Sequence, residues 1–190
     1  MSEKTPMLAN PAPLGLMGFG MTTILLNLAN LGLIGVSSII VAMGIFYGGA
    51  AQVIAGVMEF RKGNTFGTLA FTSYGLFWLS LVFIIISTVE RPAVTPDNAT
   101  WAAYLFIWGL FTLIMFFGTL RMNRALQTIF LSLTILFFLL TASHFITQLL
   151  PIAGAEGVFC GFSAVYLSAA EVLNEAYKHT VLPIGPVKAR

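Results

Sequence analysis

The chain has 190 residues, of which 58% are hydrophobic and only 8% are charged, and its mean hydropathy is +0.92. A soluble domain carries about 25% charged residues, so nine Lys/Arg and seven Asp/Glu are too few to hydrate the surface of a soluble enzyme. The same composition excludes a disordered chain and a nucleic-acid-binding protein, which needs clustered basic residues to neutralise phosphates, and it predicts an integral membrane protein.

Continuous apolar segments predict an all-α bundle of six transmembrane helices, because about 20 apolar residues are needed to cross the hydrocarbon core. The segments are uninterrupted, whereas a membrane barrel would alternate apolar and polar residues. A transmembrane domain over residues 14–177 is therefore expected between an N-terminal segment, residues 1–13, and a C-terminal tail, residues 178–190. The predicted spans are Leu14–Ile34, Ser38–Phe60, Thr65–Val89, Trp101–Leu120, Ala125–Leu149 and Gly154–Tyr177.

Local punctuation places the boundaries between these helices. Asn64 or Thr65 is expected to cap the third helix, and Asn98 or Thr100 the fourth, since short polar side chains accept hydrogen bonds from the first free backbone N–H groups. Pro151 is expected to break the chain between the fifth and sixth helices.

The distribution of cations predicts the orientation. Six helices place both termini on one side of the membrane, and only Arg91 of the nine cations lies on the opposite side. Positively charged residues mark the cytoplasmic face, so both termini are expected in the cytoplasm. The cations on that face are Lys4, Arg61, Lys62, Arg121, Arg124, Lys178, Lys188 and Arg190.

No pattern in the chain is typical of catalysis, a metal site or a cofactor. The two histidines, His144 and His179, lie in different segments, and the single Cys160 lies within an apolar segment. There is no Walker loop and no Glu/His spacing suited to a metal. The sequence therefore predicts a protein that is not an enzyme and that needs no cofactor.

Small residues follow one face of the second helix and one face of the sixth. Such faces let neighbouring backbones approach closely, so helix packing is the favoured interpretation; the alternative is that some of these residues widen a pore. The residues are Gly44, Gly48, Ala51, Ala55, Gly154, Gly157, Gly161, Ala164 and Ser168.

Uncharged polar residues within the spans are the candidates for a solute pathway. Thr22, Asn27, Gln52 and Thr72 carry hydroxyl or amide groups, which bind a small polar solute without trapping it. Many hydroxyl groups in helices instead bond the carbonyl one turn earlier. No Lys or Arg lies in the middle of a span, so an anion would have to use helix dipoles, hydroxyls and amides, or travel with a proton.

Three ionisable residues within or near the spans need separate interpretation. Glu59 lies beside Arg61 and Lys62, so an interfacial salt bridge is favoured over a role in transport. Glu171 lies about two turns inside the end of the sixth helix, where structural and proton-handling roles are equally supported. For His144 a packed, hydrogen-bonded ring is favoured, and pH sensing is the alternative.

Several motifs in order along the chain resemble the acetate uptake transporter family, the microbial succinate–acetate permeases with fungal acetate and ammonium-export relatives. The likeness begins at Asn10-Pro11-Ala12-Pro13-Leu14-Gly15-Leu16 and covers nearly the whole chain. It continues through Gly18–Thr23, Phe46–Gly49, Gly63–Gly67, Phe71–Gly75, Phe116–Leu120, Glu171–Glu175 and Val181–Gly185.

This resemblance implies a homohexamer in the cell inner (plasma) membrane, each protomer carrying its own pathway for acetate, with succinate as a second solute in some members. Transport in the family is proton-coupled or channel-like. The resemblance also implies an apolar constriction, which falls on Phe19, Tyr74 and Leu131, and an inner mouth shaped by Asn10 and Pro11. A hydrophobic ring of this kind excludes hydrated ions and favours a small, weakly hydrated or protonated solute.

Two other functions stay open at this stage. A passive channel for small neutral solutes such as urea would have a similar composition. An aquaporin would need two Asn-Pro-Ala motifs, and this chain has one. A membrane scaffold or enzyme subunit is less favoured, because the chain offers neither a redox ligand nor a long polar domain.

Overall fold

Six helices in the computed structural model, which describes residues 8–187, are long and apolar enough to cross a membrane. This confirms the predicted six-helix bundle. Short 3-10 turns lie at Pro92–Val94 (η2) and Thr147–Leu149 (η3). The spans are α1 (Ala12–Asn30), Ser38–Lys62, α4 (Thr65–Glu90), α5 (Asn98–Thr119), α6 (Arg124–Ser143) and Thr147–Tyr177, the last containing α7 (Leu150–Tyr177).

The span Ser38–Lys62 changes its winding in the middle. It consists of α2 (Ser38–Met43), a π-helical segment η1 (Gly44–Ala51) and α3 (Gln52–Lys62). The π-helical segment packs tightly on α1 and α4: a Cβ atom on Gly48 would lie 2.9 Å from both Thr22 Cγ2 and Trp78 Cγ. The small residues of this segment thus serve helix packing, as predicted.

Several helix boundaries differ from the prediction. Helix α1 ends before Gly32, which adopts the left-handed conformation (φ +78°) that favours glycine. Asp97, rather than Asn98 or Thr100, caps α5 by accepting a hydrogen bond from the Thr100 N–H at 2.7 Å. Pro151 lies in the first turn of α7, where a missing N–H costs nothing, and α6 ends earlier, at Ser143. Asn64 caps α4 as expected, by accepting from the Gly67 N–H.

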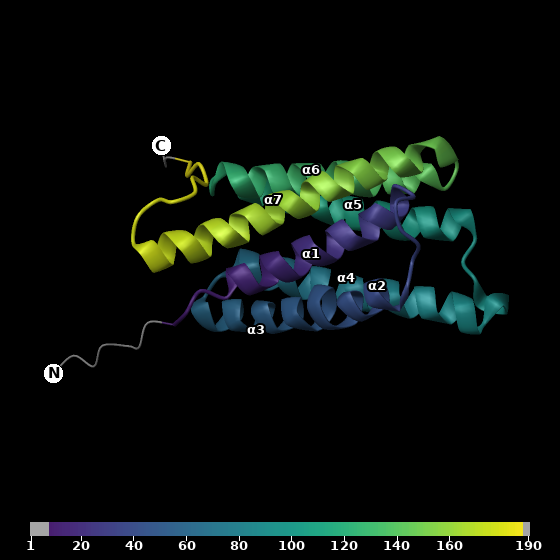
Figure 1. Cartoon of the computed structure of the whole chain (residues 1–190), viewed down its shortest axis with the longest axis horizontal. Helices are drawn as coiled ribbons and strands as arrows, with labels where there is room; N and C mark the ends of the chain where they lie inside the picture. Colours follow the sequence, from purple (N-terminus) through teal and green to yellow (C-terminus); the bar gives the residue numbers. More distant parts are fainter. Residues whose placement is uncertain (1–7, 188–190) are drawn as a thin grey trace.

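Figure 1 shows that α1 begins and α7 ends at the same end of the bundle, which we call the terminal side; the opposite end is the far side. Helix α1 packs along α7, which also contacts α6, and α6 contacts α5; α3 and η1 pack on α4. At the α1–α7 crossing a Cβ atom on Gly20 would lie 2.7 Å from the Gly161 carbonyl oxygen, and one on Gly161 2.8 Å from that of Gly20. Only glycine fits at this crossing on either helix.

The chain after α7 returns to the terminal side of α6. The Val187 N–H donates to the Met122 carbonyl (2.9 Å), and the Arg124 N–H donates to the Gly185 carbonyl (2.8 Å). The Tyr166 hydroxyl donates to the Pro183 carbonyl at 2.7 Å. The described part of the C-terminal tail is therefore docked. Lys4, Lys188 and Arg190, which enter the predicted orientation, lie outside the described residues.

Candidate solute pathway

Two cavities approach each other from opposite ends of the bundle. The terminal-side cavity has a volume of about 210 Å³ and the far-side cavity about 420 Å³. Three residues line both of them: Phe19 on α1, Tyr74 on α4 and Leu133 on α6. These side chains are the point at which the cavities meet, and we call them the constriction.

The constriction presents carbon atoms because the Tyr74 hydroxyl is already used. It donates to Thr112 Oγ1 on α5 at 2.9 Å, and the Thr112 hydroxyl donates to the Trp108 carbonyl at 2.7 Å. The Tyr74 ring lies 6.0 Å from the ring of Phe19, centroid to centroid, and packs edge-on against Phe111 at 5.4 Å. Thr112, which is fully buried, thereby fixes the ring while keeping its polar end away from the cavities.

Leu131, the predicted third member of the constriction, faces the outside of the protomer, and the prediction is wrong at this position. Its side chain is 45% exposed, whereas that of Leu133 is 4% exposed and lines both cavities. Two positions along an α-helix correspond to a rotation of about 200° around its axis, so Leu131 and Leu133 lie on nearly opposite faces. Only one of this pair can face the pathway.

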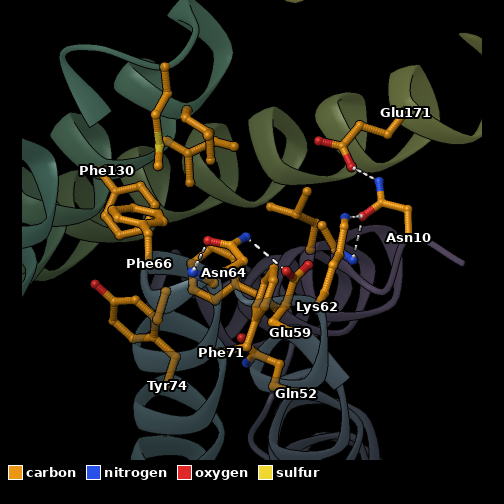
Figure 2. A pocket seen from close by; sticks show the side chains of 18 of the residues that line it. Asn10, Gln52, Glu59, Lys62, Asn64, Phe66, Phe71, Tyr74, Phe130 and Glu171 are labelled. Carbon is orange, nitrogen blue, oxygen red and sulfur yellow. Dashed lines mark hydrogen bonds between the residues drawn. The ribbon is translucent and has the colours of Figure 1, made fainter. Parts of the chain in front are cut away.

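The terminal-side cavity holds the carboxylate and ammonium side chains of the candidate pathway. Figure 2 shows Asn10 between Glu171 of α7 and Lys62 of α3. The Asn10 amide donates to Glu171 Oε2 at 2.8 Å, and Lys62 Nζ donates to Asn10 Oδ1 at 2.8 Å. Asn10 thus links two oppositely charged side chains at this mouth. The same cavity is lined by Gln52, whose Nε2 donates to the Gly48 carbonyl at 2.6 Å.

Within the described part of the chain, Glu59 does not form the interfacial salt bridge that the sequence predicted. It is fully buried and lines the terminal-side cavity (Figure 2), and its Oε2 accepts a hydrogen bond from Asn64 Nδ2 at 2.8 Å. Lys62, its expected partner, is directed to Asn10 instead. Gly67 of α4 leaves room for the carboxyl group, since a Cβ atom there would lie 3.0 Å from Glu59 Cδ.

The far-side cavity is lined by amides, hydroxyls and aromatic rings. Asn27 donates to the Thr23 carbonyl at 2.9 Å and accepts from Asn30 Nδ2 at 3.0 Å. His144, just beyond α6, stacks on the Trp101 ring with centroids 5.9 Å apart. Burial lowers the pKa of His144 below its ordinary value, because the charged ring loses water. No group of three His, Cys, Asp or Glu side chains in residues 8–187 could hold a metal ion.

Four predicted pathway residues do not line either cavity. Pro11 precedes α1, and its carbonyl accepts from the Leu14 N–H at 3.1 Å. Thr22 is buried against η1. Thr72 packs on Gly56 of α3, and Ala164 is fully buried in α7. The polar or small side chains of Thr22, Thr72 and Ala164 thus serve helix packing.

Sequence reasoning missed Thr112, chose Leu131 where Leu133 lay two residues away, and misjudged Glu59. Thr112 is the kind of isolated hydroxyl in an apolar span that ordinarily bonds its own helix, and it does so here while also holding Tyr74. Its separation of 38 residues from Tyr74 leaves no local signal. For Glu59 the available signal was Asn64, a polar residue close enough in sequence to compete with the cations.

Comparison with known proteins finds matches along nearly the whole chain. The chain is 56% identical to the succinate-acetate/proton symporter SatP of Escherichia coli strain K12, covering 94% of this chain and 96% of that protein. It is 32% identical to acetate permease A of Emericella nidulans, covering 93% of this chain and 66% of the relative.

The solved structure of the bacterial acetate channel SatP matches the fold with a TM-score of 0.92 and 56% sequence identity. The match covers 94% of this chain and 100% of the SatP chain. Residues 2–188 match the GPR1/FUN34/yaaH family. The agreement in sequence and in helix arrangement leads to one conclusion: the chain is a multi-pass membrane protein that belongs to the GPR1/FUN34/yaaH family.

Proposed function

We propose that this protein transports acetate, with succinate as a second solute, across the cell inner (plasma) membrane together with a proton. The observation that carries the proposal is the pair of cavities that meet at Phe19, Tyr74 and Leu133. Close relatives are a succinate-acetate/proton symporter and an acetate channel. Such a pathway moves solute without chemical conversion, so no enzymatic activity is proposed.

The chemistry of the constriction supports a small monocarboxylate. An apolar ring removes the hydration shell of any solute that crosses, and a two-carbon acid has one methyl group and a single carboxyl group to desolvate. The carboxyl end of the solute can bind to amide groups on the far side. On the terminal side it can bind to the side chains of Asn10, Gln52 and Lys62. Succinate has a second carboxyl group, so slower passage is expected.

The arrangement in the membrane is proposed from charge. Among the described residues, Arg61, Lys62, Arg121, Arg124 and Lys178 lie toward the terminal side, and Arg91 lies at the far side. The positive-inside rule then assigns the terminal side to the cytoplasm. We further propose that residues 14–177 form the transport domain between two cytoplasmic segments, and that six copies assemble, as the family resemblance implies.

The test is uptake of labelled acetate into proteoliposomes under an imposed proton gradient, with labelled urea as the comparison solute. We expect acetate accumulation that follows the proton gradient and exceeds that in protein-free liposomes. Urea flux without acetate flux would replace this function with a neutral-solute channel. Acetate flux that ignores the proton gradient would assign a channel without proton coupling.

A further inference from the structure

One carboxylate oxygen in the terminal-side cavity has no hydrogen-bond partner. Glu59 is fully buried, and while its Oε2 accepts from Asn64, its Oε1 has no partner among the described residues. A buried acceptor without a donor is costly, and a carboxylate oxygen can accept but not donate. Oε1 of Glu59, in the lining of this cavity, therefore lacks a hydrogen-bond donor among the described residues.

The other charged groups of the cavity do not supply that donor. Lys62, one turn further on α3, donates to Asn10, and Glu171 of α7 accepts from Asn10. These two and Glu59 are the charged residues that line the cavity in the described chain. Asn10 joins Lys62 to Glu171 and leaves Glu59 outside their network.

A solute that arrives through the constriction can bring the missing donor. The Tyr74 hydroxyl is bonded to Thr112, so the constriction offers no free donor to stabilise a carboxylate during passage. An undissociated carboxylic acid carries no charge and has a single O–H group to desolvate, which makes it the form that an apolar ring favours. Beyond the constriction its O–H group needs an acceptor.

We propose that Glu59 is that acceptor and the proton-binding group of the transport cycle. The acid O–H donates to Glu59 Oε1; then the O–H bond of the solute breaks, its electron pair stays on the solute oxygen, and an O–H bond forms on Oε1. The solute leaves as a carboxylate, and the proton passes from Glu59 to water at the terminal-side mouth. This inference rests on the proposed function and adds the residue that couples proton and solute.

The test compares Glu59→Gln with wild type in proteoliposomes that hold a pH-sensitive dye. Glutamine keeps an oxygen for Asn64 but cannot carry the proton, so we expect acetate-induced proton entry to fall to the level of protein-free liposomes. Labelled acetate exchange at equal pH, measured in the same vesicles, normalises for folding and insertion. Glu59→Asp, which restores a carboxyl group, should recover part of the proton entry.

Glu175→Gln is the matched control, because Glu175 is an exposed carboxylate on α7 that does not line the cavity. Glu175→Gln should keep the wild-type ratio of acetate-induced proton entry to labelled acetate exchange. An unchanged ratio in Glu59→Gln would overturn the inference while leaving acetate transport intact. Wild-type vesicles without acetate flux would instead refute the proposed function. Acetate entry driven by a sodium gradient would mean that Glu59 serves a metal cation.

A measurement on the wild-type protein covers the case in which both Glu59 variants fail to fold. Infrared difference spectra on addition of ¹³C-labelled acetic acid should show a new carbonyl band from a protonated side-chain carboxyl, separated from the solute band by the isotope. Spectra with no such band would contradict proton transfer to Glu59.

Discussion

Replacing Thr112 with valine tests how the constriction is built. The substitution keeps the shape of the side chain and removes the acceptor of the Tyr74 hydroxyl, which lies 2.9 Å away in a fully packed site. A buried hydroxyl left without a partner costs about 1–3 kcal/mol. The free hydroxyl must then either stay unpaired or turn toward the cavities and make the constriction polar.

Tyr74→Phe should be much milder. Thr112 would keep its own hydrogen bond to the Trp108 carbonyl at 2.7 Å, so no buried polar atom is stranded. Only the net value of one hydrogen bond is lost, about 0.5–1.5 kcal/mol. The double variant removes both partners, and its cost should be less than the sum of the two single costs.

Two assays separate these outcomes. Equilibrium unfolding in mixed detergent gives the free energy of unfolding of the four proteins in the cycle, and proteoliposome flux gives the ratio of urea to acetate passage. We expect Thr112→Val to be the least stable single variant and to raise that ratio. Equal losses in both single variants, with strict additivity in the double variant, would refute the proposed role of Thr112 as the residue that holds Tyr74.

Three further predictions concern other parts of the molecule. Leu133→Ala should change acetate selectivity and cost about 2–5 kcal/mol in unfolding free energy. Leu131→Ala, at an exposed position, should leave acetate flux at the wild-type level. Altered selectivity in Leu131→Ala with wild-type selectivity in Leu133→Ala would instead make Leu131 the third member of the constriction. Gly161→Ala should destabilise the bundle by about 1–3 kcal/mol, seen as a lower detergent-unfolding midpoint, because its Cβ would meet a backbone carbonyl of α1; an unchanged midpoint would show that the crossing can spread. The lowered pKa of His144 means that the unfolded chain binds the proton more readily, so stability is present above pH ~6.5 and is lost as pH falls below it; His144→Phe should remove that loss, and a ring pKa above the ordinary value in an NMR titration would contradict it.

The bundle itself was predictable because the bilayer imposes a simple rule of length and apolarity. Boundaries were less so, since they depend on single side chains: Asn64 caps as expected, but Asp97 was passed over for its neighbours. At each such point several residues have the right chemistry, and only the backbone direction decides which one is used.

The candidate site was predictable only in part, because the sequence identifies the chemistry of a side chain but not the direction in which it points from its helix. Gln52 and Asn27 line cavities, while Thr22 and Thr72, with the same chemistry, pack against neighbouring helices. Glu59 sits next to two cations in the sequence but bonds Asn64, because its side chain points inward. The helical phase that separates these cases depends on the partner helices, which no single segment encodes.

Under the proposed function, the hydrogen bond that turns the Tyr74 hydroxyl away from the cavities also predicts how transport responds to the membrane voltage. Each elementary charge that crosses a membrane responds to the transmembrane voltage by about 2.3 kcal/mol per 100 mV. A solute that passes an all-carbon ring as a neutral acid carries no net charge past it. If transport follows the proposed function and proton transfer, we expect it to be electroneutral, driven by the gradients of acid and pH and unaffected by the membrane voltage.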